Sequence, residues 1–252
     1  MPPDSRGDRV AETQRLDKLL GNLGYGTRKE VKKLIKDKAI EVDGKRVDDP
    51  GMHVDPAKQG IEVFGEKVNY RKYIYIIMNK PQGVISATED TREETVIDIL
   101  PEEYLPFSPA PVGRLDKDTV GLLLLTNDGQ LAHMLLSPKK HVPKVYYARI
   151  AGKVTQNDVE AFKEGVILDD GYKTLPAKLE IIESDVNSII EVEIYEGKYH
   201  QVKRMFEAVG KKVTFLMRKS MGPLKLSEDL KPGQSRELTN EELNALLEKD
   251  NI

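Results

Sequence analysis

The sequence predicts an α+β protein in which a small domain of helices and short hairpins precedes a larger domain built on a mixed or antiparallel sheet. Residues 15–68 contain two short amphipathic helix patterns followed by hairpin signals, and the chain from residue 74 is rich in strand patterns. Strands and helices do not alternate regularly, so a doubly wound parallel sheet is not expected. We therefore expect a flexible tail at 1–14, a small domain at 15–68, a linker at 69–73 and a larger domain at 74–252.

The composition is that of a globular protein without an evident cofactor. Of the 252 residues, 39% are hydrophobic and 32% are charged, and no run of about 18 apolar residues indicates a membrane span. The N-terminus lacks the apolar stretch of a signal peptide. Cysteine is absent, and the four histidines lack metal-ligand spacing. We expect a cytoplasmic protein without a membrane partner.

The basic residues are clustered although the net charge is −3. The segment 139–153 contains no acid, and the segment 200–219 contains a single one, Glu207. Their basic residues are Lys139, Lys140, Lys144, Arg149, Lys153, Lys203, Arg204, Lys211, Lys212, Arg218 and Lys219. A polyanion could therefore meet locally basic surface on a mildly acidic protein. The alternative is solvated charge spread over all faces.

The small domain begins with leucines at helical spacing from Leu16, and Gly24 ends this helix. Thr27 is a good N-cap for a second helix from Arg28, and Glu30 completes a capping box. The second helix is expected to bury Val31, Leu34 and Ile35. Two hairpins follow, one around Asp43-Gly44 and one around Gly65.

The larger domain combines strands with separate helices. Strands are predicted in YIYIIM from Tyr73, in the leucine run from Leu122, and in YYARIAG, AKLEII and IIEVEIYEG. Helices are predicted at Gly129–Leu136, Gln156–Glu164, Gln201–Val209 and Asn240–Glu248.

Two loops adjoin predicted core strands and carry candidate chemistry. Asn79–Gly83 closes the first strand with a sharp turn. The loop 113–121 alternates in charge and places Asp116 and Asp118 directly before a very apolar run. Loops anchored on buried strands are where catalytic groups are held, so each carboxylate is a candidate nucleophile, base or metal ligand. The alternative is a solvated loop in which Arg114 pairs with an aspartate.

Two further segments combine basic and aromatic residues. Lys144–Arg149 interleaves them on a strand, which suits stacking on a base beside phosphate contacts, or else ordinary cross-strand packing. In 196–206 a helix begins near His200 and carries Lys203 and Arg204 in its first turns. Cations there oppose the helix dipole by roughly a few tenths of a kcal/mol each. An anionic ligand or a carboxylate partner would account for them.

The small domain resembles the S4 RNA-binding module. The resemblance lies in RLDKLLGNLGYGTRKEVKKLIKDKAIEVDGKRV, within Arg15 to about Gly65. It implies that the basic face of the second helix contacts RNA phosphates in a shape-directed, salt-sensitive manner. The residues of that face are Arg28, Lys29, Lys32, Lys33 and Lys36.

The larger domain resembles the pseudouridine synthases of the ribosomal small-subunit synthase A type. The resemblance lies in NKPQGVI, VGRLDKDTVGLLLLTNDGQLAH, KVYYARI, EGKYHQVKRMFEAVG and the closing MGPLKL and LKPGQSREL. With the S4 module it covers about Arg15 to Leu247. LLSPKKHVPKVYYARIAG and DGQLAH look closer to the small-subunit type than to large-subunit members. The implied partner is ribosomal RNA, most of all small-subunit 16S RNA in an assembling subunit, and we expect a monomer.

The resemblance implies an isomerisation. Pseudouridine synthases detach uracil from C1′ of a uridine, rotate it and rejoin it through C5, without a cofactor, ATP or a metal. The family's essential aspartate corresponds to Asp116, which would attack C1′ or remove the 2′ proton to give a glycal. Asp116 must be ionised for either role, and a cation within about 4–6 Å would favour that state. The family supplies it from HQVKRM, so Lys203 is the first candidate and Arg204 the second.

The resemblance also assigns residues around the target nucleotide. Tyr146 is implied to stack on the uracil and to take the C5 proton, whereas Tyr147, on the opposite strand face, is expected in the core. Arg114 is expected to hold the flipped-out nucleotide, with Arg204 as a further substrate contact. The scaffold of the cleft is expected to comprise Asn79, Lys80, Pro81, Gly197, His200 and Gln201.

Two other functions are weighed against this one. A non-catalytic S4 adaptor would leave the motifs after residue 74 without a purpose. A metal-dependent hydrolase would use Asp116, Asp118 and Asp128, but these acids lack a plausible third-ligand cluster, and Lys117 separates two of them.

Overall fold

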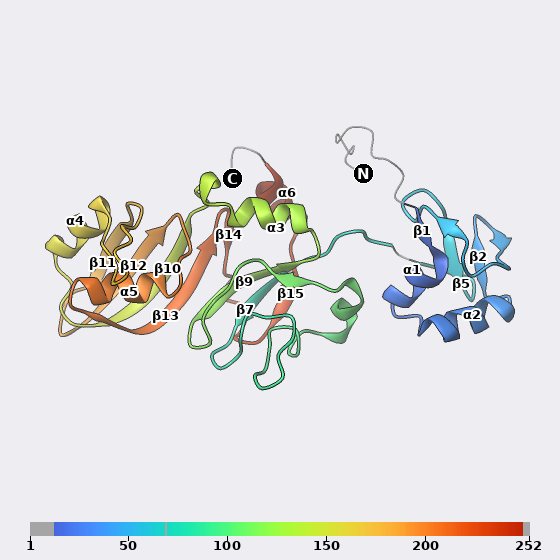
Figure 1. Ribbon diagram of the computed structural model, residues 1–252, viewed down its shortest axis with the longest axis horizontal. Helices are drawn as coiled ribbons and strands as arrows, with labels where there is room; N and C mark the ends of the chain where they lie inside the picture. Colours follow the sequence, from blue (N-terminus) through green and yellow to red (C-terminus); the bar gives the residue numbers. More distant parts are fainter. Residues whose placement is uncertain (1–12, 69, 249–252) are drawn as a thin grey trace. The chain divides into compact units, whose positions relative to one another are not determined.

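The computed structural model describes residues 13–68 and 70–248. The chain divides into two compact units, Met1–Tyr73 and Ile74–Ile252, and each is described here by itself (Figure 1). The predicted tail at 1–14 lies outside the described residues apart from Thr13 and Gln14. None of the described helices is both long enough and apolar enough to cross a membrane.

The N-terminal unit packs two helices against short antiparallel strands. Its elements are β1 (Gln14–Arg15), α1 (Leu16–Asn22), α2 (Arg28–Lys36), β2 (Ile40–Val42), β3 (Lys45–Arg46), β4 (His53–Val54), β5 (Ile61–Val63) and β6 (Glu66–Lys67). β1 pairs with β4, and the other strands form a sheet in the order β3-β2-β5-β6. Both predicted hairpins are therefore confirmed, and the helices and strands share one apolar core.

Helix α2 begins where the sequence predicts. The Thr27 backbone N–H donates to Glu30 Oε2 at 2.7 Å, and the Glu30 backbone N–H donates to Thr27 Oγ1 at 3.4 Å. These two bonds confirm the predicted capping box. Val31 and Ile35 are buried as expected, whereas Leu34 is only partly buried.

The C-terminal unit is a mixed sheet with helices beside it. Its strands are β7 (Tyr75–Lys80), β8 (Ala110–Pro111), β9 (Val120–Thr126), β10 (Lys144–Ala151), β11 (Lys178–Glu183), β12 (Asn187–Ile194), β13 (Lys212–Met221), β14 (Leu224–Lys225) and β15 (Ser235–Glu237). Its α-helices are α3 (Gly129–Leu136), α4 (Gln156–Glu164), α5 (Gln201–Ala208) and α6 (Asn240–Leu247), with 3₁₀ turns at Glu102–Phe107 and Pro138–Lys140. All four predicted helices are present, and two of them end one residue earlier than predicted.

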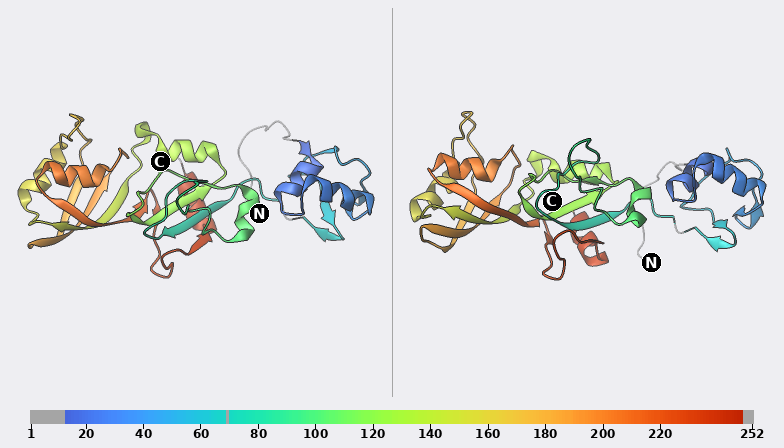
Figure 2. Two further views of the ribbon diagram at one scale, coloured as in Figure 1. Left: turned by 60° about the horizontal axis from the view of Figure 1, so that its bottom comes forward. Right: turned by 90° about the horizontal axis from the view of Figure 1, so that it is seen from below.

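The nine-stranded sheet has the central order β11-β12-β10-β13-β9-β7-β15, with β14 beside β13 and β8 beside β9. β13 and β9 are parallel, and the other pairs are antiparallel. The predicted mixed sheet of an α+β fold is therefore confirmed. Helices α4 and α5 lie beside β10–β13, and α3 and α6 lie beside β7 and β9 (Figures 1 and 2).

The leucine run in β9 is buried on both faces of the sheet. Leu123 and Leu125 belong to the core that contains residues of α4 and α5. Leu122 and Leu124 belong to a second core with residues of α3 and α6. Side chains alternate across a strand, so an unbroken apolar run is what a strand covered on both faces requires.

Two expectations about the strands are wrong. Tyr147 was expected in the core, but it is half-exposed and contacts Phe215 edge-on, whereas Tyr146 is the buried member of the pair. Alternation places the two tyrosines on opposite faces, but it does not say which face is covered. The long strand β13 has no counterpart among the predicted strands, because basic residues interrupt its apolar pattern.

Candidate active site

The backbone around Asp116 is fixed from below by a buried lysine. Lys80, at the end of β7, is 0% exposed. Its Nζ donates to the carbonyl oxygens of Pro81 (3.0 Å), Asp116 (3.1 Å) and Thr119 (2.9 Å). Burial lowers the pKa of Lys80 to about 8, although the negative charge of Asp116 favours the ammonium form. Lys80 therefore joins the end of β7 to the loop before β9, in the scaffold position that was expected for it.

A second set of hydrogen bonds holds the same loop from the side. Ser86 Oγ donates to the carbonyl of Leu115 at 2.9 Å and accepts from the Leu115 N–H at 3.0 Å. The Gly83 N–H donates to the Lys117 carbonyl at 2.8 Å. Both partners come from the segment after β7, so the motif Asn79–Gly83 and the loop 113–119 form one structural unit.

The Asp116 carboxylate faces helix α5. Its Oδ2 lies 2.8 Å from Lys203 Nζ, and its Oδ1 lies 3.5 Å from His200 Nε2. Lys203 Nζ also lies 2.6 Å from Asp118 Oδ1. One ammonium therefore bridges the two carboxylates that the sequence singled out.

The charges of this cluster stabilise one another. Partial burial disfavours the Lys203 ammonium, but its hydrogen bonds to Asp116 and Asp118 outweigh this effect and raise its pKa. Burial disfavours the Asp118 carboxylate as well, but the hydrogen bond and the charge of Lys203 lower its pKa overall. The cluster is therefore held in its ionised form.

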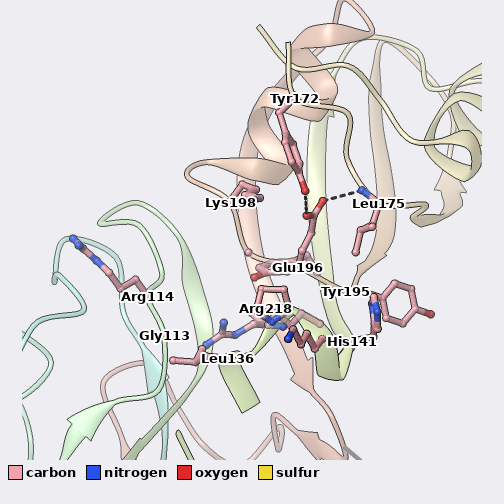
Figure 3. A pocket seen from close by; sticks show the side chains of 15 residues that line it. Gly113, Arg114, Leu136, His141, Tyr172, Leu175, Tyr195, Glu196, Lys198 and Arg218 are labelled. Atoms are coloured by element: carbon pink, nitrogen blue, oxygen red, sulfur yellow. Dashed lines mark hydrogen bonds between the residues drawn. The ribbon is translucent and has the colours of Figure 1, made fainter. Parts of the chain in front are cut away.

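The start of α5 is anchored by buried polar residues. Glu196 accepts hydrogen bonds from the Tyr172 hydroxyl (2.7 Å), the Leu175 N–H (2.9 Å) and Gln201 Nε2 (2.9 Å), the first two drawn in Figure 3. Gln201 Oε1 accepts from the Lys198 N–H at 2.9 Å. These bonds fix the turn that presents His200 and Lys203 to Asp116.

Tyr146 lies between two adjoining cavities. Its side chain, on β10, is 8% exposed, and its hydroxyl makes no hydrogen bond to any described residue. A cavity of about 80 Å³ is lined by Asp116 and His200, and one of about 500 Å³ by residues that include Glu196 and Arg218 (Figure 3). Arg114, Tyr146, Gly197 and Lys198 line both cavities. Together the two form a cleft with Asp116 at one end.

Residues 74–208, which include this cleft, match the RNA pseudouridylate synthase family. The chain belongs to the pseudouridine synthase family. Residues 14–59 match the S4 domain, the RNA-binding module that the sequence predicts. The protein is therefore an RNA pseudouridine synthase, an isomerase that converts uridine in RNA to pseudouridine.

Relatives of this synthase resemble it over nearly their full length. An uncharacterized RNA pseudouridine synthase of Bacillus subtilis, YtzG, is 56% identical over 93% of this chain and 98% of its own. The ribosomal large subunit pseudouridine synthase B of Bacillus subtilis is 39% identical over 92% of this chain and 95% of its own. The ribosomal small subunit pseudouridine synthase A of Vibrio parahaemolyticus is also 39% identical, over 92% and 99%.

A solved structure supports the same fold. The crystal structure of a pseudouridylate synthase is 36% identical and superposes with a TM-score of 0.65, covering 93% of this chain and 100% of the other.

The two arginines predicted near the substrate differ in their surroundings. Arg204 does not contact Asp116, because its guanidinium pairs with Asp169 and, at 2.7 Å, with Asp170. Arg114 is exposed at the rim of the cleft, where it makes no ion pair with a described residue and points away from the labelled residues of the opposite wall (Figure 3). The structure thus brings together Asp116, Lys203 and Tyr146, with Arg114 at the opening and Arg204 occupied elsewhere.

Asp128 does not join the carboxylates of the cleft. Its side chain caps α3 by accepting from the N–H groups of Gln130 and Leu131, and it accepts from the Tyr75 hydroxyl at 3.0 Å. Within residues 13–68 and 70–248, no group of three or more His, Asp or Glu side chains could hold a metal ion. The hydrolase alternative therefore lacks its third acid.

The basic face of α2 is available to a ligand. All five predicted RNA-binding side chains of this helix are exposed: Arg28, Lys29, Lys32, Lys33 and Lys36. The acid of the same helix, Glu30, is occupied by the capping box. The exposed helix face is thus strongly positive.

Proposed function

We propose that this synthase isomerises one uridine of small-subunit ribosomal RNA, with Asp116 as the residue that acts on the ribose. The observation that carries the proposal is the Asp116 carboxylate, 2.8 Å from Lys203 and at one end of a cleft that Tyr146 also lines. In the reaction the N1–C1′ bond breaks, the C5–C1′ bond forms, and the proton of C5 is replaced by one on N1. Atoms and charges balance without a second substrate or a cofactor.

Each residue of the cleft has a role in this proposal. Asp116 attacks C1′ or removes the 2′ proton, and both routes use an ionised carboxylate. Lys203 keeps that carboxylate ionised. Tyr146 stacks on the uracil and takes the C5 proton, and its hydroxyl has no competing partner among the described residues. Arg114, at the opening, holds the flipped-out nucleotide.

The choice of RNA rests on the sequence and on the S4 domain. Relatives of both ribosomal types match at 39% identity, and small-subunit RNA is favoured by the stretches LLSPKKHVPKVYYARIAG and DGQLAH. The basic face of α2 would dock on structured RNA through its phosphates. We propose that the protein acts in the cytoplasm as a monomer on the assembling small subunit.

Tritium release from 5-tritiated uridine tests the reaction. Small-subunit and large-subunit transcripts, free or assembled with ribosomal proteins, are incubated with enzyme in the presence and absence of EDTA. We expect release from small-subunit RNA that EDTA does not reduce. Release that depends on a metal, or that occurs only from large-subunit RNA, would contradict the proposal.

A further inference from the structure

Two cations lie under the cleft beside Tyr146. Lys144 is 8% exposed, Arg218 is 2% exposed, and both line the larger cavity. Lys144 is two residues from Tyr146 on β10, so their side chains share one face of the strand. Arg218, on β13, is the direct cross-strand partner of Tyr146. The three side chains therefore form one cluster on the face of the sheet that lines the cleft.

Neither cation has a carboxylate partner among the described residues. Lys144 Nζ donates to the Val142 carbonyl at 2.9 Å, and Arg218 Nε donates to the Leu122 carbonyl at 2.8 Å. Arg218 Nη2 is buried without a hydrogen bond to any described residue. The buried acid of the same cavity, Glu196, is already bound by three other donors. The floor of the cavity therefore carries two positive charges that this chain does not neutralise.

This arrangement is unfavourable in the free protein. Burial lowers the pKa of Lys144 to about 8, and the neighbouring charge of Arg218 lowers it further. A buried unpaired charge is destabilising, and an unsatisfied donor beside it adds to the penalty. An anion bound to both groups would reverse these effects.

We propose that Lys144 and Arg218 bind a backbone phosphate next to the target uridine, an inference that rests on the proposed function. A neutral base edge would leave both charges uncompensated, whereas a phosphate neutralises them. The guanidinium offers two parallel donors and the ammonium a point charge, which together suit a phosphate. Cβ atoms of directly opposed strand residues are about 4.5–5.5 Å apart, so the phosphate would be within one nucleotide of a uracil stacked on Tyr146.

Neutral substitutions in the RNA backbone test the proposal. Each phosphate within two nucleotides of the target uridine is replaced singly by a methylphosphonate, and kcat/KM is measured for the wild type, Lys144→Met and Lys139→Met. We expect one position at which the wild type loses about tenfold or more, while Lys144→Met loses less than twofold. Lys139 is an exposed lysine of the same cavity, so Lys139→Met should retain the tenfold loss.

The outcomes separate the phosphate site from the reaction itself. Unmodified RNA is measured in parallel, so a complete absence of turnover refutes the proposed function. Turnover that no methylphosphonate alters in the wild type refutes the phosphate site, and this result needs no variant. Equal losses in the wild type and Lys144→Met also refute it. If inorganic phosphate raises the melting temperature of the wild type but methylphosphonates have no effect, the site binds a free anion, and the RNA assignment is wrong.

The stability of Lys144→Met gives an independent readout. Methionine fills a similar volume without charge, so the free variant should melt at the same temperature as the wild type or higher. The folded pKa of Lys144, about 8, is below the ordinary value of 10.5. Between these values the unfolded chain binds the extra proton, so wild-type stability rises with pH. The advantage of the variant should be largest below about pH 8 and shrink above it. A variant that melts lower at every pH would indicate a merely structural lysine and overturn the proposal.

Discussion

Replacing Lys203 by methionine tests the electrostatics of the site. Lys203 Nζ contacts both Asp116 (2.8 Å) and Asp118 (2.6 Å). The substitution removes the cation and leaves two carboxylates close to each other. Ionisation of Asp116 then becomes less favourable, because a like charge remains and the opposite charge is gone. The variant should therefore lose its ionised carboxylate at a higher pH than the wild type.

The size of the shift depends on how much water reaches the pair. An opposite charge nearby changes the titration of a carboxylate by about 1–3 units, or about 1.4 kcal/mol per unit. In the free protein the side chains of Asp116 and Lys203 are 28% and 18% exposed, so solvent screens them and the lower end applies. Bound RNA would cover the cleft, and the upper end then applies.

The assay is a pair of pH–rate profiles. The acid limb of kcat/KM, which reports the free enzyme, should move up by about one pH unit, and that of kcat, which reports the complex, by up to about three. Activity near neutral pH should fall at least tenfold and return in part as the pH rises. Lys203→Arg should be milder, because the charge remains.

The matched control is Arg204→Met. Arg204 is the next residue on the same helix and also pairs with two aspartates, but it does not contact Asp116. Its removal should not move the acid limb. A wild-type profile for Lys203→Met, or a shifted profile for Arg204→Met alone, would refute the reasoning.

Three further predictions concern other parts of the chain. Asp116→Asn should abolish tritium release without changing RNA affinity, whereas Asp118→Asn should be far milder; a tenth of wild-type activity in the first variant would refute the role of Asp116. Deleting residues 1–73 should weaken RNA binding and flatten its salt dependence, while cooperative thermal unfolding persists because each unit has its own core; loss of that cooperativity would place the boundary elsewhere. Gly121→Ala should destabilise the fold by about 2 kcal/mol or more in urea unfolding, because φ is +101° and the added Cβ would lie 2.4 Å from a carbonyl of β13; Gly129→Ala, with nothing within 4 Å, is the control and should be nearly neutral.

The local structure of the small domain could be predicted because its signals are local. Thr27 and Glu30 define the start of α2 by their spacing alone, and Gly44 and Gly65 mark the hairpins. β13 could not be predicted in this way, because Arg218 is buried at a position where the binary pattern calls for an apolar residue. Its environment comes from strands that are distant in the sequence.

The site shows the same division between local and tertiary information. Motif resemblance indicated Asp116 and Tyr146, and it left Lys203 and Arg204 as alternatives. Neighbouring helix residues point about 100° apart, so the docking of α5 decides which one contacts the loop. The Ser86 bonds and the buried pair of Lys144 and Arg218 depend on cross-strand neighbours, which no spacing along the chain reveals.

The most direct test of the central claim is a map of pseudouridines in ribosomal RNA from cells of the source strain. RNA is compared from cells with the gene, cells without it, and deleted cells carrying either the wild-type gene or Asp116→Asn. The account predicts that one pseudouridine of small-subunit RNA disappears with the gene and returns with the wild type but not with Asp116→Asn. An unchanged map in the deleted cells, or restoration by Asp116→Asn, would contradict it.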